Sequence, residues 1–188
     1  RFYYHRKAMN KIGRNQNIKS KMYKNKKILI VIPARGRSKR LPGKNIKKIG
    51  AKPMLAHAIE AARKSNYVDR VVVSTDDNAI ARVAKKYKAE VPFIRPAELA
   101  ADTAPTLPVL HHAVRFYENE LRFKPDLIIL IQPTNPLIKT EDIDKTIYTL
   151  FKTKTNTCFT VTEISQRPEW MYRLYKKPEL FIKKTSGL

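Results

Sequence analysis

The sequence has a single cysteine among 188 residues, Cys158, so no disulfide can form within the chain. Cys158 stands in an apolar run, where a thiol is typical of a buried strand rather than of a nucleophile. No apolar run is long enough to cross a bilayer, and no signal-peptide pattern is visible. These absences exclude a disulfide scaffold and a spanning membrane protein, and they predict a cytoplasmic protein that does not bind a membrane.

Acidic residues are missing from the N-terminal third of the chain. Residues 1–59 contain 18 Lys and Arg and no Asp or Glu, whereas the remaining 129 residues contain 21 basic and 16 acidic side chains. The net charge of +23 therefore arises mainly from this third. We expect residues 1–26 to form a flexible basic extension, which either stays solvated or binds nucleic acid. Met22 is an alternative start, which would leave residues 1–21 outside the fold.

Short apolar runs alternate with amphipathic patterns along the rest of the chain. This alternation predicts a mostly parallel sheet with helices on both faces, the α/β class. Residues 27–188 are expected to form one domain, and residues 165–188, irregular and aromatic, are a candidate dimerisation arm. Because the chain stops at Leu188 without a closing strand-and-helix unit, we expect it to be C-terminally truncated. The predicted strands are Lys27–Pro33, Arg70–Ser74, Val91–Ile94, Leu127–Gln132 and Cys158–Thr162, and the predicted helices are Met54–Ser65, Asn78–Lys88, Thr106–Arg122 and Glu141–Lys152.

A basic loop follows the first predicted strand. Residues 32–45 contain five cations, two glycines and no acid. Ligands of α/β proteins bind at the carboxyl ends of the strands. Cationic side chains and backbone N–H groups at that edge are suited to phosphate oxygens. The spacing differs from GxxxxGK[ST] and from GxGxxG, so we predict a phosphate site of another type.

Three further segments end at the same predicted edge. Ser74 is followed by Asp76, a carboxylate that can bind Mg²⁺, contact a ribose or cap the next helix. Arg95 stands just past an apolar run, ahead of Thr103 and Thr106. Gln132 ends a deeply apolar strand, where a carboxamide needs hydrogen-bond partners. These side chains are suited to the base and sugar parts of a nucleotide substrate.

The segment Ile32–Asn45 resembles the IPARxGSKRxPGKN signature of the CMP-sugar cytidylyltransferases, especially the CMP-N-acetylneuraminate synthetases. The resemblance continues in order through residues 52–54, 74–77, 90–99, 102–103 and 132–137. It implies a Rossmann-like nucleotidyltransferase fold, a three-layer sandwich. It also implies Mg²⁺-dependent transfer of CMP from CTP to a nine-carbon sugar acid, and a homodimer.

The resemblance also implies roles for particular residues. Arg35 and Lys44 would hold the triphosphate as catalytic residues, and Gln132 would contact the sugar acid. Asp76 would hold Mg²⁺, by analogy with the related 3-deoxy-manno-octulosonate enzymes. The remaining nucleotide-binding residues would be Ala34, Ser38, Lys39, Asn45, Ser74, Arg95, Thr103 and Thr106.

Two departures from the signature affect these expectations. Arg37 stands where the signature has glycine, which would cost about 1–2 kcal/mol if that position had positive φ. The family's C-terminal segment with paired metal-binding aspartates is missing. Three functions therefore follow from the sequence: an active enzyme for N-acetylneuraminate or a legionaminate- or pseudaminate-like acid, a truncated CTP-binding pseudoenzyme, or a basic nucleic-acid-binding protein acting through residues 1–59. Nucleic acid is the least favoured, because the loop has no aromatic side chain for stacking.

Overall fold

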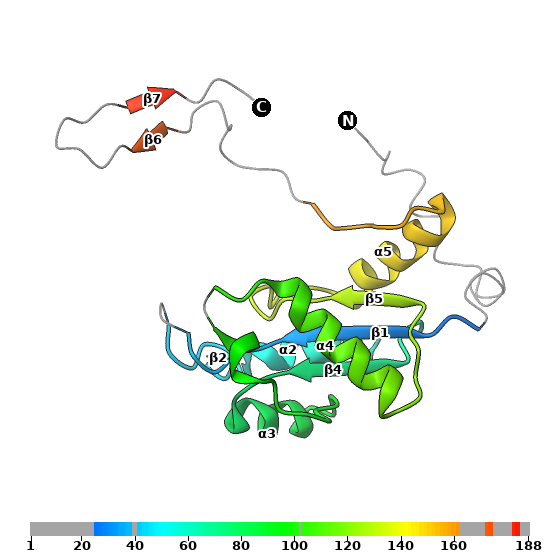
Figure 1. Ribbon diagram of the computed structural model, residues 1–188. Coiled ribbons are helices and arrows are strands. Elements are labelled where there is room, and N and C mark those ends of the chain that lie inside the picture. Colours follow the sequence, from blue (N-terminus) through cyan, green and yellow to red (C-terminus); the bar gives the residue numbers. More distant parts are fainter. Residues whose placement is uncertain (1–24, 39–40, 102, 162–171, 175–181, 185–188) are drawn as a thin grey trace. The chain divides into compact units, whose positions relative to one another are not determined.

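The computed structural model describes residues 25–38, 41–101 and 103–161, and the strands at residues 172–174 and 182–184 (Figure 1). The chain divides into two units, one ending at Cys158 and one beginning at Phe159. The described elements of the first unit are β1 (Ile28–Pro33), β2 (Lys48–Ile49), β3 (Lys52–Pro53), α2 (Met54–Arg63), β4 (Arg70–Ser74), α3 (Asn78–Lys86), the 3₁₀ helix η2 (Ala97–Ala100), α4 (Thr106–Asn119), β5 (Leu127–Leu130) and α5 (Thr140–Thr153).

The main sheet is parallel, with strand order β4-β1-β5. Its central strand, β1, reads Ile-Leu-Ile-Val-Ile-Pro, and its first five side chains are completely buried. A continuous apolar run is what a strand needs when helices cover both of its faces. The sheet therefore places the carboxyl ends of β1, β4 and β5 along one edge, each followed by a loop.

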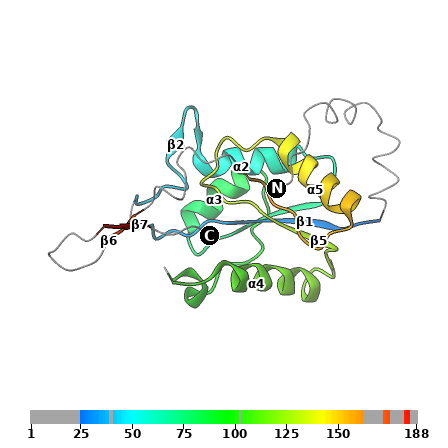
Figure 2. The same cartoon turned by 90° about the horizontal axis from the view of Figure 1, so that it is seen from above.

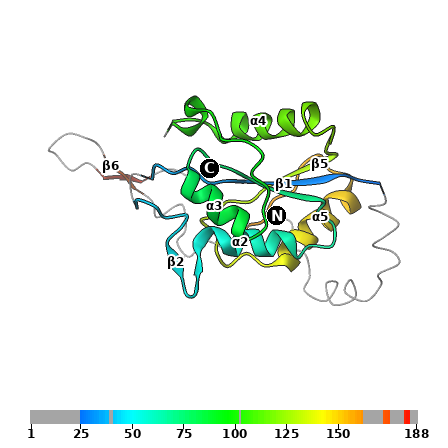
Figure 3. The same ribbon diagram turned by 90° about the horizontal axis from the view of Figure 1, so that it is seen from below.

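The helices form a layer on each face of the sheet. Figures 2 and 3 show α4 on one face and α2, α3 and α5 on the other. The larger apolar core joins α2, α3 and α5 to one side of the strands, and a smaller one joins α4 to Leu29, Val31 and Val72 on the other side. The fold is thus a three-layer α/β sandwich, as the sequence predicts.

Most of the predicted elements are confirmed. Three of the five strands and all four helices lie where the sequence places them, with shifts of a few residues at their ends. The predicted strand Val91–Ile94 is wrong. Only Glu90 pairs there, in an isolated parallel bridge with Val72. Pro92 lacks the N–H that a longer ladder with β4 would use, so pairing stops after one bridge.

The predicted strand at Cys158–Thr162 is also wrong over its described part. Residues 158–161 have no strand structure, and the side chains of Phe159 and Val161 are 79% and 82% exposed. An apolar run becomes a strand only where a neighbour supplies ladder hydrogen bonds. In the second unit, β6 (Tyr172–Leu174) and β7 (Ile182–Lys184) form an antiparallel pair.

Two domain predictions fall largely outside the described residues. Residues 1–24 of the basic extension are not described, and of the expected dimerisation arm only β6 and β7 are described. The extension and the dimer therefore stay predictions. Within the described residues, each helix is too short or too polar to span a bilayer.

Candidate functional site

A cavity of about 260 Å³ opens at the carboxyl edge of the sheet. Four separate parts of the chain line it: the loop after β1, the segment before and within η2, the start of α4, and the loop after β5. Its lining residues are Pro33, Arg35, Lys44, Asn45, Arg95, Leu99, Ala101, Ala104, Thr106, Val109, Gln132, Pro133 and Thr134. The fold thus gathers residues up to 101 positions apart around one cavity.

About half of the residues that the sequence predicts for the functional site line this cavity. Six of them line it: Arg35, Lys44, Asn45, Arg95, Thr106 and Gln132. Five described ones do not line it: Ala34, Ser38, Ser74, Asp76 and Thr103. The twelfth, Lys39, lies outside the described residues. The roles of all twelve stay predictions, but the structure separates the residues that line the cavity from those that do not.

Two of the five residues outside the cavity are structural partners of its wall. Ala34 is buried, and its backbone N–H donates to the carbonyl of Ser74 at 2.9 Å, which extends the β1–β4 ladder. The hydroxyl of Ser74 is also buried and accepts a hydrogen bond from Nε of Arg95 at 3.0 Å. Ser74 therefore supports Arg95 and does not reach into the cavity itself.

The loop after β1 is tied down at the peptide between Arg35 and Gly36. The carbonyl oxygen of Arg35 accepts from Nδ2 of Asn45 at 2.9 Å, and the N–H of Gly36 donates to Oδ1 of Asp76 at 2.9 Å. Asn45 is only 3% exposed, so its amide needs this partner. Both polar groups of this peptide therefore have hydrogen-bond partners. These bonds also fix the direction in which the side chain of Arg35 leaves the loop.

Gly36 is required by a close approach rather than by its backbone conformation. A Cβ atom placed on it would lie 2.6 Å from Oδ2 and 2.7 Å from Cβ of Asp77, which no side chain can do. Arg37 is not among the residues with positive φ, so the strain considered for an arginine at this position does not arise. Positive φ in this loop occurs at Gly43, with φ +66°.

Arg95 is a buried cation, 5% exposed, with its head group at the cavity wall. Its guanidinium donates to the hydroxyl and the carbonyl of Ser74 and, at 3.4 Å, to the carbonyl of Leu99. Burial lowers the pKa of Arg95, the nearby charge of Asp76 opposes this, and Arg35 lowers it further. No carboxylate lies within ion-pair distance of Arg95 among the described residues, so part of its charge is available to a ligand.

The cavity wall is positively charged. Arg35, Lys44 and Arg95 line it, and its lining residues within the described part of the chain include no Asp or Glu. Nη1 of Arg35 donates to the carbonyl oxygen of Ala101 at 3.4 Å, so the side chain of Arg35 lies along one wall of the cavity. Cations fixed around a partly enclosed space favour an anion such as a triphosphate. Gln132 and Thr106 add neutral polar groups that suit a sugar or a base.

Asp76, the predicted Mg²⁺ ligand, already has interactions within the protein. One of its oxygens is engaged by Gly36, and its charge acts on the nearby Arg95. No group of three or more His, Cys, Asp or Glu that could hold a metal ion exists among the described residues. Asp77 is not available either, because Oδ1 caps α3 by accepting from the N–H groups of Ala79 and Ile80. A helix cap was one of the roles considered for Asp76, and the structure has Asp77 as the cap of α3.

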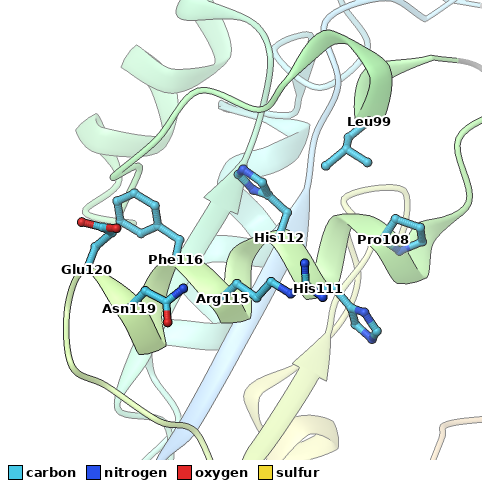
Figure 4. Close-up of a pocket in the computed structure, with 8 residues that line it drawn as sticks. All are labelled: Leu99, Pro108, His111, His112, Arg115, Phe116, Asn119 and Glu120. Carbon is cyan, nitrogen blue, oxygen red and sulfur yellow. The ribbon is translucent and has the colours of Figure 1, made fainter.

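A second and larger cavity, about 480 Å³, lies along the outer side of α4 (Figure 4). Figure 4 shows His111, His112, Arg115 and Phe116 along the helix. Arg115 and Glu120 are its charged lining residues and have opposite signs, so this cavity offers no net field for a polyanion. His112 packs edge-on against Phe93, with ring centroids 4.6 Å apart. The smaller cavity, with its cationic lining, is therefore the better candidate for binding an anion.

Some contributors to the site were missed by sequence reasoning. The apolar lining by Leu99 and Val109 carries no chemical signal of its own. The tie between Asn45 and Arg35 was also missed, because an asparagine ten residues away from a carbonyl gives no pattern. The close contact between Gly36 and Asp77 had some support in the sequence. A glycine stands among cations after one strand, and two adjacent acids follow the next strand.

Comparison with known proteins gives a consistent result. Residues 29–174 match the protein-family model described as Cytidylyltransferase. The chain is 40% identical over 161 residues to CMP-N,N'-diacetyllegionaminic acid synthase of Legionella pneumophila, covering 82% of this chain and 68% of that protein. It is 34% identical over 157 residues to pseudaminic acid cytidylyltransferase of Campylobacter jejuni, covering 83% and 67%.

A solved structure is similar in the same region. It is CMP:2-keto-3-deoxy-manno-octonic acid synthetase complexed with CTP, with a TM-score of 0.57 and 27% identity. The match covers 68% of this chain and 48% of that one. The chain thus spans about two thirds of the two curated relatives and about half of this solved structure.

Proposed function

We propose that this chain, which belongs to the cytidylyltransferase family, transfers CMP from CTP to a nine-carbon 2-keto sugar acid and releases pyrophosphate. The observation that carries the proposal is the cationic cavity, which Arg35, Lys44 and Arg95 line together with Gln132. Relatives named for legionaminic and pseudaminic acid support an acid of this class. Because the chain covers only part of these relatives, the activity is proposed for the whole protein.

The chemistry is a displacement at phosphorus. The anomeric hydroxyl oxygen of the sugar acid forms a bond to the α-phosphorus of CTP and loses its proton to water. The bond from the α-phosphorus to the oxygen that bridges to the β-phosphate breaks, and pyrophosphate leaves with that electron pair. Negative charge grows on the leaving pyrophosphate, so fixed cations lower the barrier without a covalent nucleophile.

The lining residues divide between the two substrates. Arg35 and Lys44 would contact the triphosphate and stabilise the leaving group, and Asn45, Arg95 and Thr106 would contact the nucleotide. Gln132 would orient the sugar acid through its exposed carboxamide. Because these groups come from a rigid sheet edge, they need little ordering when substrates bind.

We propose Mg²⁺ as the cofactor, brought in with CTP. Mg²⁺ is held mainly by phosphate oxygens and water in nucleotide complexes and takes few protein ligands. When bound it supplies further neutralisation of the phosphates. We also propose a cytoplasmic homodimer, which light scattering after size-exclusion chromatography tests through the molar mass.

Pyrophosphate release tests the proposed reaction. The chain, extended to the full length of its relatives, is mixed with CTP, Mg²⁺ and each of three acids: N-acetylneuraminate, N,N'-diacetyllegionaminate and pseudaminate. We expect release with at least one acid and none when either substrate is omitted. CTP binding without release from any acid would instead identify a pseudoenzyme.

A matched pair of amide variants tests which cavity holds the sugar acid. Gln132 lines the smaller cavity and Asn119 the larger one, and both side chains are exposed. Gln132→Ala should raise the KM for the acid about tenfold and leave the KM for CTP unchanged, as expected for the loss of one hydrogen bond to a charged or polar partner. Asn119→Ala should change neither constant. The reverse pattern would move the acid site to α4.

A further inference from the structure

We infer that Asp76 is a positioning residue that fixes Arg35 for the phosphates of CTP, and that it is not a metal ligand. The inference rests on the proposed function, because Arg35 is the residue whose direction matters there. It concerns one peptide unit, the one that joins Arg35 to Gly36. Two side chains from elsewhere in the chain hold this peptide from its two polar ends.

Asn45 and Asp76 form what we call the clamp, a pair of hydrogen bonds to the two ends of this peptide. Nδ2 of Asn45 donates to the carbonyl oxygen of Arg35, and Oδ1 of Asp76 accepts from the N–H of Gly36, with both distances 2.9 Å. The carbonyl and N–H of a trans peptide point in opposite directions. Rotation of the peptide plane therefore breaks both hydrogen bonds at once, and the plane has one favoured orientation.

A packing contact limits the same peptide. Asp77 is fixed as the cap of α3 through its bonds to Ala79 and Ile80. The α-carbon of Gly36 lies so close to Asp77 that an added Cβ would come within 2.6 Å of Oδ2. The loop therefore lies directly on the first turn of α3. The loop cannot move toward the helix, and the two hydrogen bonds of the clamp prevent rotation of the peptide plane.

The charges around Asp76 argue against a metal ion at this carboxylate. Arg95 and Arg35 are close enough to interact electrostatically, and Asp76 is the group that opposes the lowering of the Arg95 pKa by burial. A divalent cation at Asp76 would be repelled by the guanidinium group of Arg95 and would take away its counter-charge. The negative charge of Asp76 is used within the protein itself.

The consequence for binding is preorganisation. Arg35 lines the cavity and continues from the clamped peptide, so the start of its side chain is already directed when CTP arrives. Ordering a free loop on binding would cost affinity. Removing the acceptor of Gly36 should therefore weaken CTP binding even where no metal ion is present.

Amide hydrogen exchange of Gly36, followed by NMR in the CTP-free protein, tests the clamp directly. Asp76→Ala removes the acceptor, and we expect Gly36 to exchange about tenfold to a hundredfold faster, as for a lost hydrogen bond to a charged group. Asp76→Asn keeps an acceptor oxygen of similar shape and should restore most of the protection. Unchanged exchange of Gly36 in Asp76→Ala would overturn the inference whether or not the protein binds CTP.

CTP dissociation constants, measured by calorimetry with EDTA and with Mg²⁺, separate positioning from metal binding. For positioning, Asp76→Ala weakens CTP binding about tenfold or more under both conditions, and Asp76→Asn recovers most of the affinity. The Mg²⁺ concentration for half-maximal turnover then stays unchanged in both variants. For a metal ligand, binding in EDTA is unaffected and both variants need at least about tenfold more Mg²⁺, which would refute the inference.

Two further variants act on the clamp without touching Asp76. Gly36→Ala drives a methyl group against Asp77 and should weaken CTP binding in EDTA as Asp76→Ala does. Asn45→Ala releases the other end of the same peptide, so its effect should be less than additive with Asp76→Ala. Fully additive effects would contradict a shared peptide. If the wild-type protein binds no CTP, the proposed function fails, while the exchange of Gly36 still decides the clamp.

Discussion

At the amino ends of the strands, Lys26 pairs with Asp126 at 2.8 Å and Arg70 pairs with Glu90 at 3.0 Å. At the carboxyl ends, Lys44 and Arg95 line a cavity, and no carboxylate lies within ion-pair distance of them among the described residues. Within the described residues, the amino end of the sheet pairs its cations with carboxylates, whereas Lys44 and Arg95 at the carboxyl end have no ion-pair partner.

This difference separates structural charge from functional charge. Paired surface ions contribute little to stability, and they attract no ligand because their fields cancel at short range. Cations without an ion-pair partner are costly to bury, and Arg95 is only 5% exposed with no carboxylate at ion-pair distance among the described residues. A fold that keeps such groups at one edge is organised for an anion at that edge, and variants at the two ends should therefore behave differently.

The largest effect is expected for Arg35. Arg35→Ala removes a cation from the cavity wall and should lower kcat/KM by about 10²–10³-fold, the range for losing one preorganised group that stabilises developing charge. Arg63→Ala is the matched control, because Arg63 is an exposed arginine in the last turn of α2 and changes the net charge equally. Pyrophosphate-release kinetics measure both. Equal losses would mean that overall charge, and not the site, attracts the substrate.

CTP should stabilise the protein through the carboxyl end. At a CTP concentration about a hundred times the dissociation constant, binding adds about 2.7 kcal/mol to the free energy of unfolding. Differential scanning fluorimetry should show this as a rise in Tm. Lys44→Met should reduce the rise, whereas Lys64→Met, an exposed lysine at the end of α2, should keep it. A rise that survives Lys44→Met would place the triphosphate elsewhere.

At the amino end, Tyr117 should affect stability alone. Its ring is completely buried, and its hydroxyl donates to Oε2 of Glu90 at 2.8 Å. Burial and this hydrogen bond raise the pKa of Tyr117, so the group stays a donor. Tyr117→Phe should lower the free energy of unfolding by about 1 kcal/mol in urea titrations. The dissociation constant for CTP should not change, and a weakened one would show that the two ends are coupled.

The same contrast explains what could be predicted from the sequence. The strands β1 and β4 and all four helices follow from continuous apolar runs and helical periodicity, which are local properties. The predicted strand at residues 91–94 failed because pairing depends on a neighbour and on the missing N–H of Pro92. Local sequence pattern predicts elements whose own apolar residues are buried. It does not predict a strand at the edge of the sheet, which depends on pairing with a neighbouring strand.

The site divides in the same way. Arg35 and Gln132 could be predicted from their places just after β1 and β5, because such side chains meet at one edge of the sheet, whereas the resemblance to the cytidylyltransferase signature implied roles for Lys44, Asn45, Arg95 and Thr106. The supporting contacts of Ser74 with Arg95 and of Asp76 with Gly36 could not be predicted, because they depend on which atoms lie within 3.0 Å of one another in the folded chain. A motif shows that a carboxylate is needed near the loop, but it does not show whether that carboxylate faces a metal ion or a backbone N–H.

The smallest effect is expected at Asp126, and it depends on pH. Hydrogen bonds from the Lys26 side chain and from the backbone N–H of Lys27 hold the pKa of Asp126 below its usual 3.8. A lowered pKa in the folded state means that the contribution to stability is present above pH 3.8 and is lost as the pH falls through the folded-state pKa. Asp126→Asn should therefore lower Tm slightly at pH 7 and not at all well below pH 3. Because the pair is exposed, added salt should weaken the difference at pH 7. CTP affinity should match the wild-type value throughout, since this carboxylate neutralises a cation that has no part in the cavity. A loss of affinity in Asp126→Asn would mean that charge compensation at the amino end also organises the carboxyl end.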